Sequence, residues 1–149
     1  MMELTLKAIV QNLPQVTAFV EDARDALECP PTASGDVAGW TKRRMRAAMQ
    51  IDVAVDEMFT NISSYAYAPN VGEATIRFDF DAATCRAFIT FEDSGIAYNP
   101  LEKPDPDVTL SADKRKIGGL GIFLVKKTMD DVLYERRDGR NILTIVKQI

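Results

Sequence analysis

Glu57-Met58-Phe59-Thr60-Asn61 lies near the carboxyl end of the longest helical pattern in the chain, residues 41–67. Apolar side chains recur there at every third or fourth position and predict a face packed on a core, including Met45, Met49, Ile51, Val55 and Phe59. Glu57 and Asn61 lie one turn apart on the same side of that helix. Such a pair is usually a solvated helix face. Beside a nucleotide, however, the Asn61 carbonyl would ligate Mg²⁺ and Glu57 would deprotonate an attacking hydroxyl group.

Outside this helix, the sequence predicts strands and helices that alternate along one domain, residues 1–149. A helix is expected from residue 12 to about residue 27, and another from residue 121 to residue 129. Strands are expected at residues 3–10, 74–80, 85–91, 132–136 and 142–149. The last two are joined at Asp138-Gly139, a strong hairpin sequence. Helices that interrupt a largely antiparallel set of strands predict a two-layer α/β sandwich.

The composition excludes several classes of protein. The formal net charge of −4 argues against nucleic acid as the main partner. No apolar run approaches the roughly 20 residues of a membrane-spanning helix, and no signal peptide is recognised, so we expect a cytoplasmic protein with no membrane partner. The chain has no histidine. That excludes a Ser-His-Asp triad, a Cys-His pair and histidine-ligated zinc within it.

Two further features of the sequence, its cysteines and a basic cluster, are interpreted as structural. Cys29 and Cys85 are far apart and fit no metal or redox motif, so reduced, partly buried thiols are expected. The basic residues Lys42, Arg43, Arg44 and Arg46 precede the apolar part of the long helical pattern. They are interpreted as a solvated helix entry, with a docking patch for an acidic protein as the alternative.

Asp93-Ser94-Gly95 directly follows a predicted strand. An aspartate there can accept a hydrogen bond from an exocyclic amine such as that of adenine, and Gly95 would let the backbone pass close to a flat ring. The alternative is a simple turn. The proline-containing segment that follows, residues 100–118, is long enough to be a lid over a site.

Gly118, Gly119 and Gly121 mark the start of a predicted helix. Glycines at such a start expose backbone N–H groups and the positive end of the helix dipole to phosphate. No Gly-Lys-Ser or Gly-Lys-Thr follows, so this is not a P-loop, and the glycine spacing does not fit a dinucleotide fingerprint. A hinge for the preceding lid is a second interpretation, compatible with the first.

Together these three motifs resemble the GHKL ATP-binding family, whose Bergerat-type fold has a mixed, mostly antiparallel sheet covered on one face by about three helices. Residues 57–61 resemble its N box, residues 93–100 its first glycine box and residues 118–122 its second. The tail is similar to the anti-sigma-factor serine kinases of the RsbW and SpoIIAB kind, at Leu124, Val125, Lys126, Lys127, Met129, Asp130, Tyr134, Gly139, Asn141 and Lys147.

The resemblance implies a role for each matching residue. Glu57 would be the catalytic base, Asn61 the Mg²⁺ ligand and Asp93 the adenine-binding residue. The other implied nucleotide-binding positions are Gly95, Asn99, Lys116, Gly118, Gly119, Leu120 and Gly121. Lys116 would supply mobile positive charge for phosphate. Thr144 would lie near the adenine, with an ordinary strand threonine as the alternative.

The resemblance therefore favours an ATP- and Mg²⁺-dependent serine kinase that phosphorylates an anti-sigma-factor antagonist and also binds a sigma factor. A homodimer is the assembly that the resemblance implies. The alternative is a nucleotide-gated binding module with little or no kinase activity, in which ATP orders the lid. A detached catalytic domain of a histidine kinase is disfavoured because the chain has no histidine and no dimerisation helix pair ahead of the domain.

Overall fold

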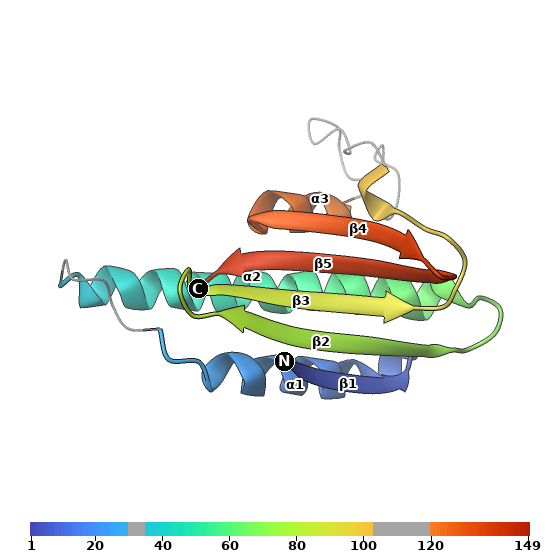
Figure 1. Cartoon of the computed structure of the whole chain (residues 1–149), viewed down its shortest axis with the longest axis horizontal. Helices are drawn as coiled ribbons and strands as arrows, with labels where there is room; N and C mark the ends of the chain where they lie inside the picture. Colours follow the sequence, from blue (N-terminus) through green and yellow to red (C-terminus); the bar gives the residue numbers. More distant parts are fainter. Residues whose placement is uncertain (30–34, 103–119) are drawn as a thin grey trace.

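The computed structural model describes residues 1–29, 35–102 and 120–149. Its strands form one open sheet in the order β1-β2-β3-β5-β4, and every pairing among them is antiparallel (Figure 1). The strands are β1 (Met2–Lys7), β2 (Glu73–Asp81), β3 (Arg86–Asp93), β4 (Asp131–Arg137) and β5 (Arg140–Gln148). The tight β4–β5 connection contains Asp138 and Gly139, both with positive φ, as the hairpin sequence predicts.

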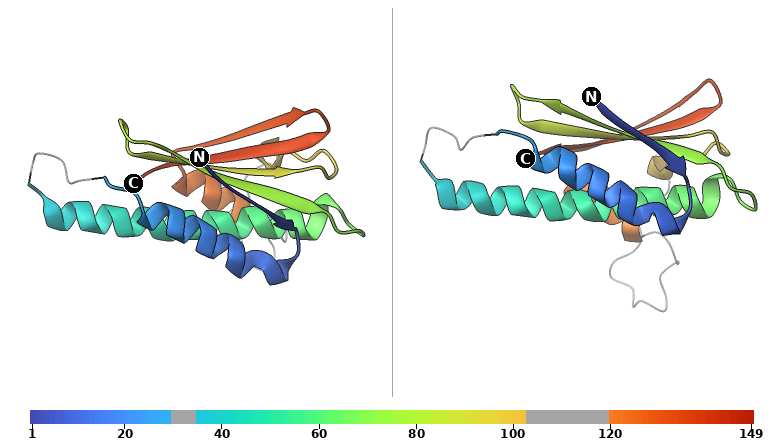
Figure 2. Two further views of the ribbon diagram at one scale, coloured as in Figure 1. Left: turned by 60° about the horizontal axis from the view of Figure 1, so that its bottom comes forward. Right: turned by 90° about the horizontal axis from the view of Figure 1, so that it is seen from below.

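Three α-helices cover one face of this sheet, α1 (Leu13–Asp25), α2 (Val37–Asn61) and α3 (Leu120–Thr128). Figure 2 shows all three on the same side of the strands, with α1 beside α2. The two-layer sandwich predicted from the sequence is thereby confirmed. Three short turns complete the described elements, η1 (Val10–Asn12), the π-helical η2 (Ile62–Ala66) and η3 (Pro100–Glu102). In the ranges that the structure describes, no helix is long and apolar enough to cross a membrane.

The core lies between the helices and the sheet. Alternate residues of β2 and β3 point into it, as period-two patterning predicts, and α2 contributes Ile51, Val55 and Phe59. Met45 and Met49 were expected on the same buried face, but their side chains are 62% and 68% exposed. That detail of the predicted face is wrong, because the buried stripe of α2 is narrower than the run of apolar residues along it.

Part of the basic cluster at the start of α2 has a structural role. Arg44 donates hydrogen bonds to the carbonyl oxygens of Leu27 (2.8 Å) and Cys29 (3.3 Å), and its guanidinium lies 5.4 Å from the centre of the Trp40 ring. These contacts tie α2 to the chain that leaves α1. Arg44 is thus engaged within the fold rather than offered to a partner.

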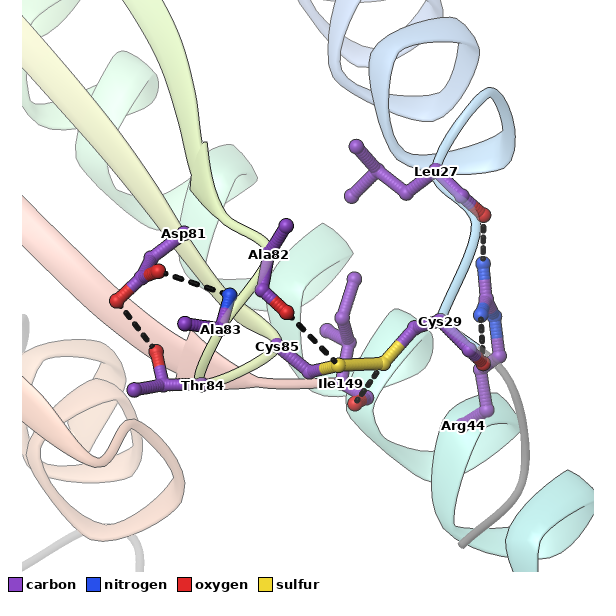
Figure 3. The surroundings of a disulfide bond; sticks show 9 residues. All are labelled: Leu27, Cys29, Arg44, Asp81, Ala82, Ala83, Thr84, Cys85 and Ile149. Carbon is purple, nitrogen blue, oxygen red and sulfur yellow. Dashed lines mark hydrogen bonds between the residues drawn. A yellow bond between two sulfur atoms is a disulfide. The ribbon is translucent and has the colours of Figure 1, made fainter.

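Cys29 and Cys85 form a disulfide, with their Cα atoms 6.2 Å apart (Figure 3). The expectation of two reduced thiols is wrong for this structure. The bond joins the segment after α1 to the turn between β2 and β3, close to the carbonyl groups that Arg44 binds. The cysteines are 56 positions apart in sequence, and that spacing says nothing about proximity until the sheet places the β2–β3 turn beside the end of α1.

We expect Cys85→Ser to lower the free energy of unfolding by about 2–4 kcal/mol without reductant, because the disulfide restricts the unfolded chain. Urea unfolding with and without dithiothreitol measures this effect. In dithiothreitol the wild type should fall to the stability of the variant. If dithiothreitol leaves the wild type unchanged, the disulfide does not stabilise the protein in solution.

Candidate functional site

An open, mostly apolar pocket lies between the carboxyl end of α2, the turn η2 and the sheet. Two of its polar lining residues, Asn61 and Asp93, belong to the predicted motifs 57–61 and 93–100. The remaining lining residues are Met58, Ile62, Tyr65, Ala66, Phe91, Ile96, Tyr98, Pro100, Tyr134, Asn141 and Leu143. A mostly apolar pocket with a few convergent polar groups is typical of a small-molecule site.

Glu57 and Asn61 come together on the last turns of α2, as their spacing predicts. The Asn61 side-chain nitrogen lies 3.4 Å from Oε1 of Glu57 and donates to it, and both residues are half-buried. In this contact the amide nitrogen of Asn61 faces Glu57. Its carbonyl oxygen accepts no hydrogen bond from the described residues and is left for a ligand.

Asp93 is the last residue of β3 and is buried. Its Oδ1 atom accepts hydrogen bonds from the backbone N–H of Gly95 (2.9 Å) and from the side chain of Asn141 (3.0 Å). Its Oδ2 atom has no partner among the described residues, and Asp93 lines the pocket. One carboxylate oxygen is therefore fixed by the fold while the other can accept from a ligand.

Gly95 has a structural reason for being glycine in addition to the role predicted from the sequence. A Cβ atom there would lie 2.2 Å from the carbonyl oxygen of Ala66, the residue that ends η2. The next residue, Ile96, donates its N–H to the same carbonyl over 2.9 Å. The missing side chain thus allows two segments of the protein itself to pack closely, whatever the pocket holds.

Gly121, in the first turn of α3, lies directly against the proposed base. A Cβ atom there would lie 2.1–2.3 Å from the three carboxylate atoms of Glu57. The glycine lets α3 approach α2 closely enough for this carboxylate to fit between them. Two of the predicted motifs, 57–61 and 118–122, are therefore in contact at this point.

Several other predicted site residues lie outside the pocket. The Asn99 side chain accepts a hydrogen bond from the N–H of Leu101 (2.9 Å) and so caps η3. Leu120 is half-exposed at the start of α3. Lys116, Gly118, Gly119 and the predicted lid beyond Glu102 lie outside the described residues, so their placement stays a prediction.

Thr144 is on the wrong face of the sheet for contact with a ligand in the pocket. It pairs with Thr90 across β3 and β5, and their hydroxyl groups are 3.0 Å apart. Its neighbour Leu143 lines the pocket, and successive side chains of a strand point to opposite faces. The placement of Thr144 near the adenine is thereby corrected in favour of the ordinary strand threonine.

Asn141, Tyr134 and Tyr98 line the pocket but were not predicted as site residues. From the sequence, Asn141 and Tyr134 are noted only among the residues near the carboxyl terminus that resemble the anti-sigma-factor serine kinases. The sequence does hold one indication: Asn141 has the same strand parity as the buried Leu143 and Ile145. A polar residue at a core-facing position is informative because buried polar groups need specific partners.

Glu92 supports the end of β3 from the face opposite the helices. It forms ion pairs with Arg77 and, at 2.6 Å, with Arg140. Burial alone would raise the pKa of Glu92, but the hydrogen bonds from Arg140 and Arg77 outweigh burial and hold the pKa below its ordinary value. The strand that carries Asp93 is thus anchored to β2 and to the β4–β5 hairpin.

The family model of the histidine kinase-like ATPase domain matches residues 6–147. The chain belongs to this family. The match extends over all three motifs and over each strand and helix that builds the pocket, and it confirms the resemblance read from the sequence. In this histidine kinase-like ATPase domain, residues of two of the three motifs, 57–61 and 93–100, line the pocket between α2 and the sheet.

Within this family, the chain is similar to curated proteins that are named as serine or serine/threonine kinases. The serine/threonine-protein kinase BtrW of Bordetella bronchiseptica is 31% identical over 100 residues, which is 67% of this chain and 70% of that protein. The serine-protein kinase RsbW of Bacillus mycoides is 32% identical over 95 residues, and RsbW of Bacillus cereus (strain B4264) is 33% identical over 95 residues. These matches cover 61% of this chain and 58% of each RsbW protein.

Proposed function

We propose that this protein binds ATP and transfers its γ-phosphoryl group to a serine of a partner protein. One observation carries the proposal: the pocket is lined by Asp93, whose Oδ2 atom has no partner among the described residues, and by Asn61, whose side-chain nitrogen lies 3.4 Å from Glu57. The relatives named as serine-protein kinases support the reaction class.

The chemistry of the lining fits a purine nucleotide. Phe91, Met58 and Leu143 offer an apolar surface to a flat base, and Oδ2 of Asp93 would accept a hydrogen bond from the exocyclic amine of adenine. The triphosphate would extend toward Asn61 and the start of α3. There the backbone N–H groups at Gly118, Gly119, Leu120 and Gly121 and the charge of Lys116 would bind phosphate.

Mg²⁺ suits the oxygen donors at this end of the pocket. The Asn61 carbonyl oxygen is a hard ligand on an amide whose nitrogen faces Glu57, and the phosphates of the nucleotide would supply other ligands. The ion would neutralise charge on the transferred phosphoryl group.

Glu57 would act as general base. Its carboxylate takes the proton of the serine hydroxyl while the hydroxyl oxygen forms a bond to the γ-phosphorus and the bond to the leaving ADP breaks. Phosphoryl transfer depends mainly on positioning and on charge neutralisation, so few side chains are needed. Contact with Asn61 and Gly121 holds the Glu57 carboxylate in place for this step.

The partner of this reaction would be an anti-sigma-factor antagonist, and the protein would also hold a sigma factor and so regulate transcription. A cytoplasmic homodimer is part of the same proposal. These points rest on the similarity to the RsbW and BtrW kinases and not on any feature of the pocket.

The test combines binding and transfer. Isothermal titration with ATP and GTP in the presence of Mg²⁺ should show binding that favours ATP, and [γ-³²P]ATP should label a serine of a candidate antagonist. Chelation of Mg²⁺ should abolish the label. Tight ATP binding without transfer to any antagonist of this class would rule out the kinase and leave a nucleotide-gated binding module.

A further inference from the structure

Asn141 is the best-connected polar side chain at the pocket. It lies near the start of β5, is buried and makes four hydrogen bonds. Its Nδ2 atom donates to Oδ1 of Asp93 (3.0 Å) and to the carbonyl of Ile96 (2.7 Å). Its Oδ1 atom accepts from the N–H of Tyr98 (3.1 Å) and from the hydroxyl of Tyr134 (2.5 Å).

This set of partners requires an amide in one orientation. Both donors of Asn141 meet acceptors, and its oxygen meets two donors. An aspartate would bring a second carboxylate against Asp93 and lose both donations. A leucine of similar shape would leave the N–H of Tyr98 and the carbonyl of Ile96 without this partner inside the protein.

The four contacts join three separate segments around the side-chain amide of Asn141. Asp93 ends β3, Ile96 and Tyr98 belong to the loop that follows, and Tyr134 lies on β4. All four residues line the pocket. Asn141 therefore fixes the shape of this pocket wall as well as the rotamer of the Asp93 carboxylate.

The consequence concerns the free oxygen of Asp93. Asn141 and the N–H of Gly95 both occupy Oδ1, so a ligand meets Oδ2 alone. A single fixed acceptor binds a base edge that offers a donor, such as the 6-amino group of adenine. It disfavours a base edge that presents a carbonyl oxygen at the same place, because two acceptors then face each other.

We propose that Asn141 is a positioning residue that sets base specificity, by holding Asp93 so that only Oδ2 faces the base. This inference rests on the proposed nucleotide site. It predicts that the preference for a 6-amino group depends on Asn141, although the polar atoms of Asn141 bind other groups of the protein.

The experiment compares the dissociation constants of ATP and of purine riboside 5′-triphosphate, which lacks only the 6-amino group, by isothermal titration. In the wild type, ATP should bind about 10- to 100-fold more tightly, the expected effect of one hydrogen bond to a charged group. In Asn141→Leu the ratio should fall to about threefold or less, because Asp93 loses the side-chain hydrogen bond that holds its carboxylate and keeps only that from the N–H of Gly95.

Two further variants separate positioning from loss of stability. Ile145→Val shortens a buried side chain on the same strand and should lower the melting temperature without changing the ratio. Tyr134→Phe removes one donor to Asn141 and keeps the ring, so it should lower the ratio partly and serves as the test if Asn141→Leu does not fold.

The outcomes are distinct. A wild-type ratio near one, or no ATP binding at all, overturns the proposed nucleotide site together with this inference. If the wild type prefers ATP and folded Asn141→Leu keeps the same preference, only the role of Asn141 is overturned. If Asn141→Leu does not fold, an undiminished preference in Tyr134→Phe overturns that role instead. A ratio that falls equally in Ile145→Val also overturns it, because general destabilisation then explains the effect.

Discussion

Glu57→Gln is expected to lower the rate of phosphoryl transfer by about 10²- to 10⁴-fold, the usual contribution of a general base. The variant keeps the size of the side chain and its contact with Asn61 but cannot take up a proton. ATP affinity should stay within about threefold of the wild type, since Glu57 is proposed to act on the attacking hydroxyl group rather than on the nucleotide. Single-turnover transfer from [γ-³²P]ATP to the partner serine measures the rate.

Asp56→Asn is the matched control for this experiment. Asp56 precedes Glu57 on α2 but points outward, where its carboxylate accepts a hydrogen bond from Thr60 (3.1 Å). Asp56→Asn removes one negative charge, as Glu57→Gln does, but away from the pocket. Its rate of phosphoryl transfer should therefore match that of the wild type. A Glu57→Gln protein that transfers phosphate at the wild-type rate would exclude Glu57 as the base.

The regular part of the fold was predictable because local patterns specify it. The order of helices and strands follows from apolar periodicity, and Asp138-Gly139 specified the hairpin. Family resemblance then identified the motifs that contain Asn61 and Asp93. Both residues do line one pocket, although they are 32 positions apart in the sequence.

The errors have a common cause, which is the position of residues in three dimensions. β5 carries apolar residues on both faces, so its sequence did not reveal that Leu143 faces the pocket and Thr144 faces away. Cys29 and Cys85 meet only because the sheet brings the β2–β3 turn to the end of α1. Asn141 acquires its four partners from three segments, none of which is adjacent to it in sequence.

The glycines show the same limit at a finer scale. From the sequence, both glycine motifs are expected to serve the ligand, by close approach to a ring or as phosphate-binding backbone, with a simple turn and a lid hinge as the alternatives. In the structure Gly95 is in contact with the Ala66 carbonyl, and Gly121 with the Glu57 carboxylate. The sequence alone does not show whether a glycine is required for close packing within the protein or for close contact with a ligand.

Gly121→Ala is the second large effect, and it should separate stability from activity. Alanine favours a helix by roughly 0.5–1 kcal/mol over glycine, so α3 should be slightly stabilised. Its Cβ atom would lie within 2.3 Å of the Glu57 carboxylate carbon and oxygens, which must therefore move. A displacement of about 1 Å can lower a rate by roughly 10²-fold, and we expect a loss of this size with an unchanged or higher melting temperature.

A double-mutant cycle shows whether this loss acts through Glu57. If Gly121→Ala only displaces the base, it should have almost no further effect on the residual rate of Glu57→Gln. A loss that persists in the Glu57→Gln background, together with weaker ATP binding, would instead assign Gly121 to the phosphates. The Glu57 atoms that meet the added methyl group are the carboxylate atoms at the flexible end of its side chain, so the fold can accommodate this group. Gly121→Ala is therefore expected to lower the rate of phosphoryl transfer rather than the stability of the fold.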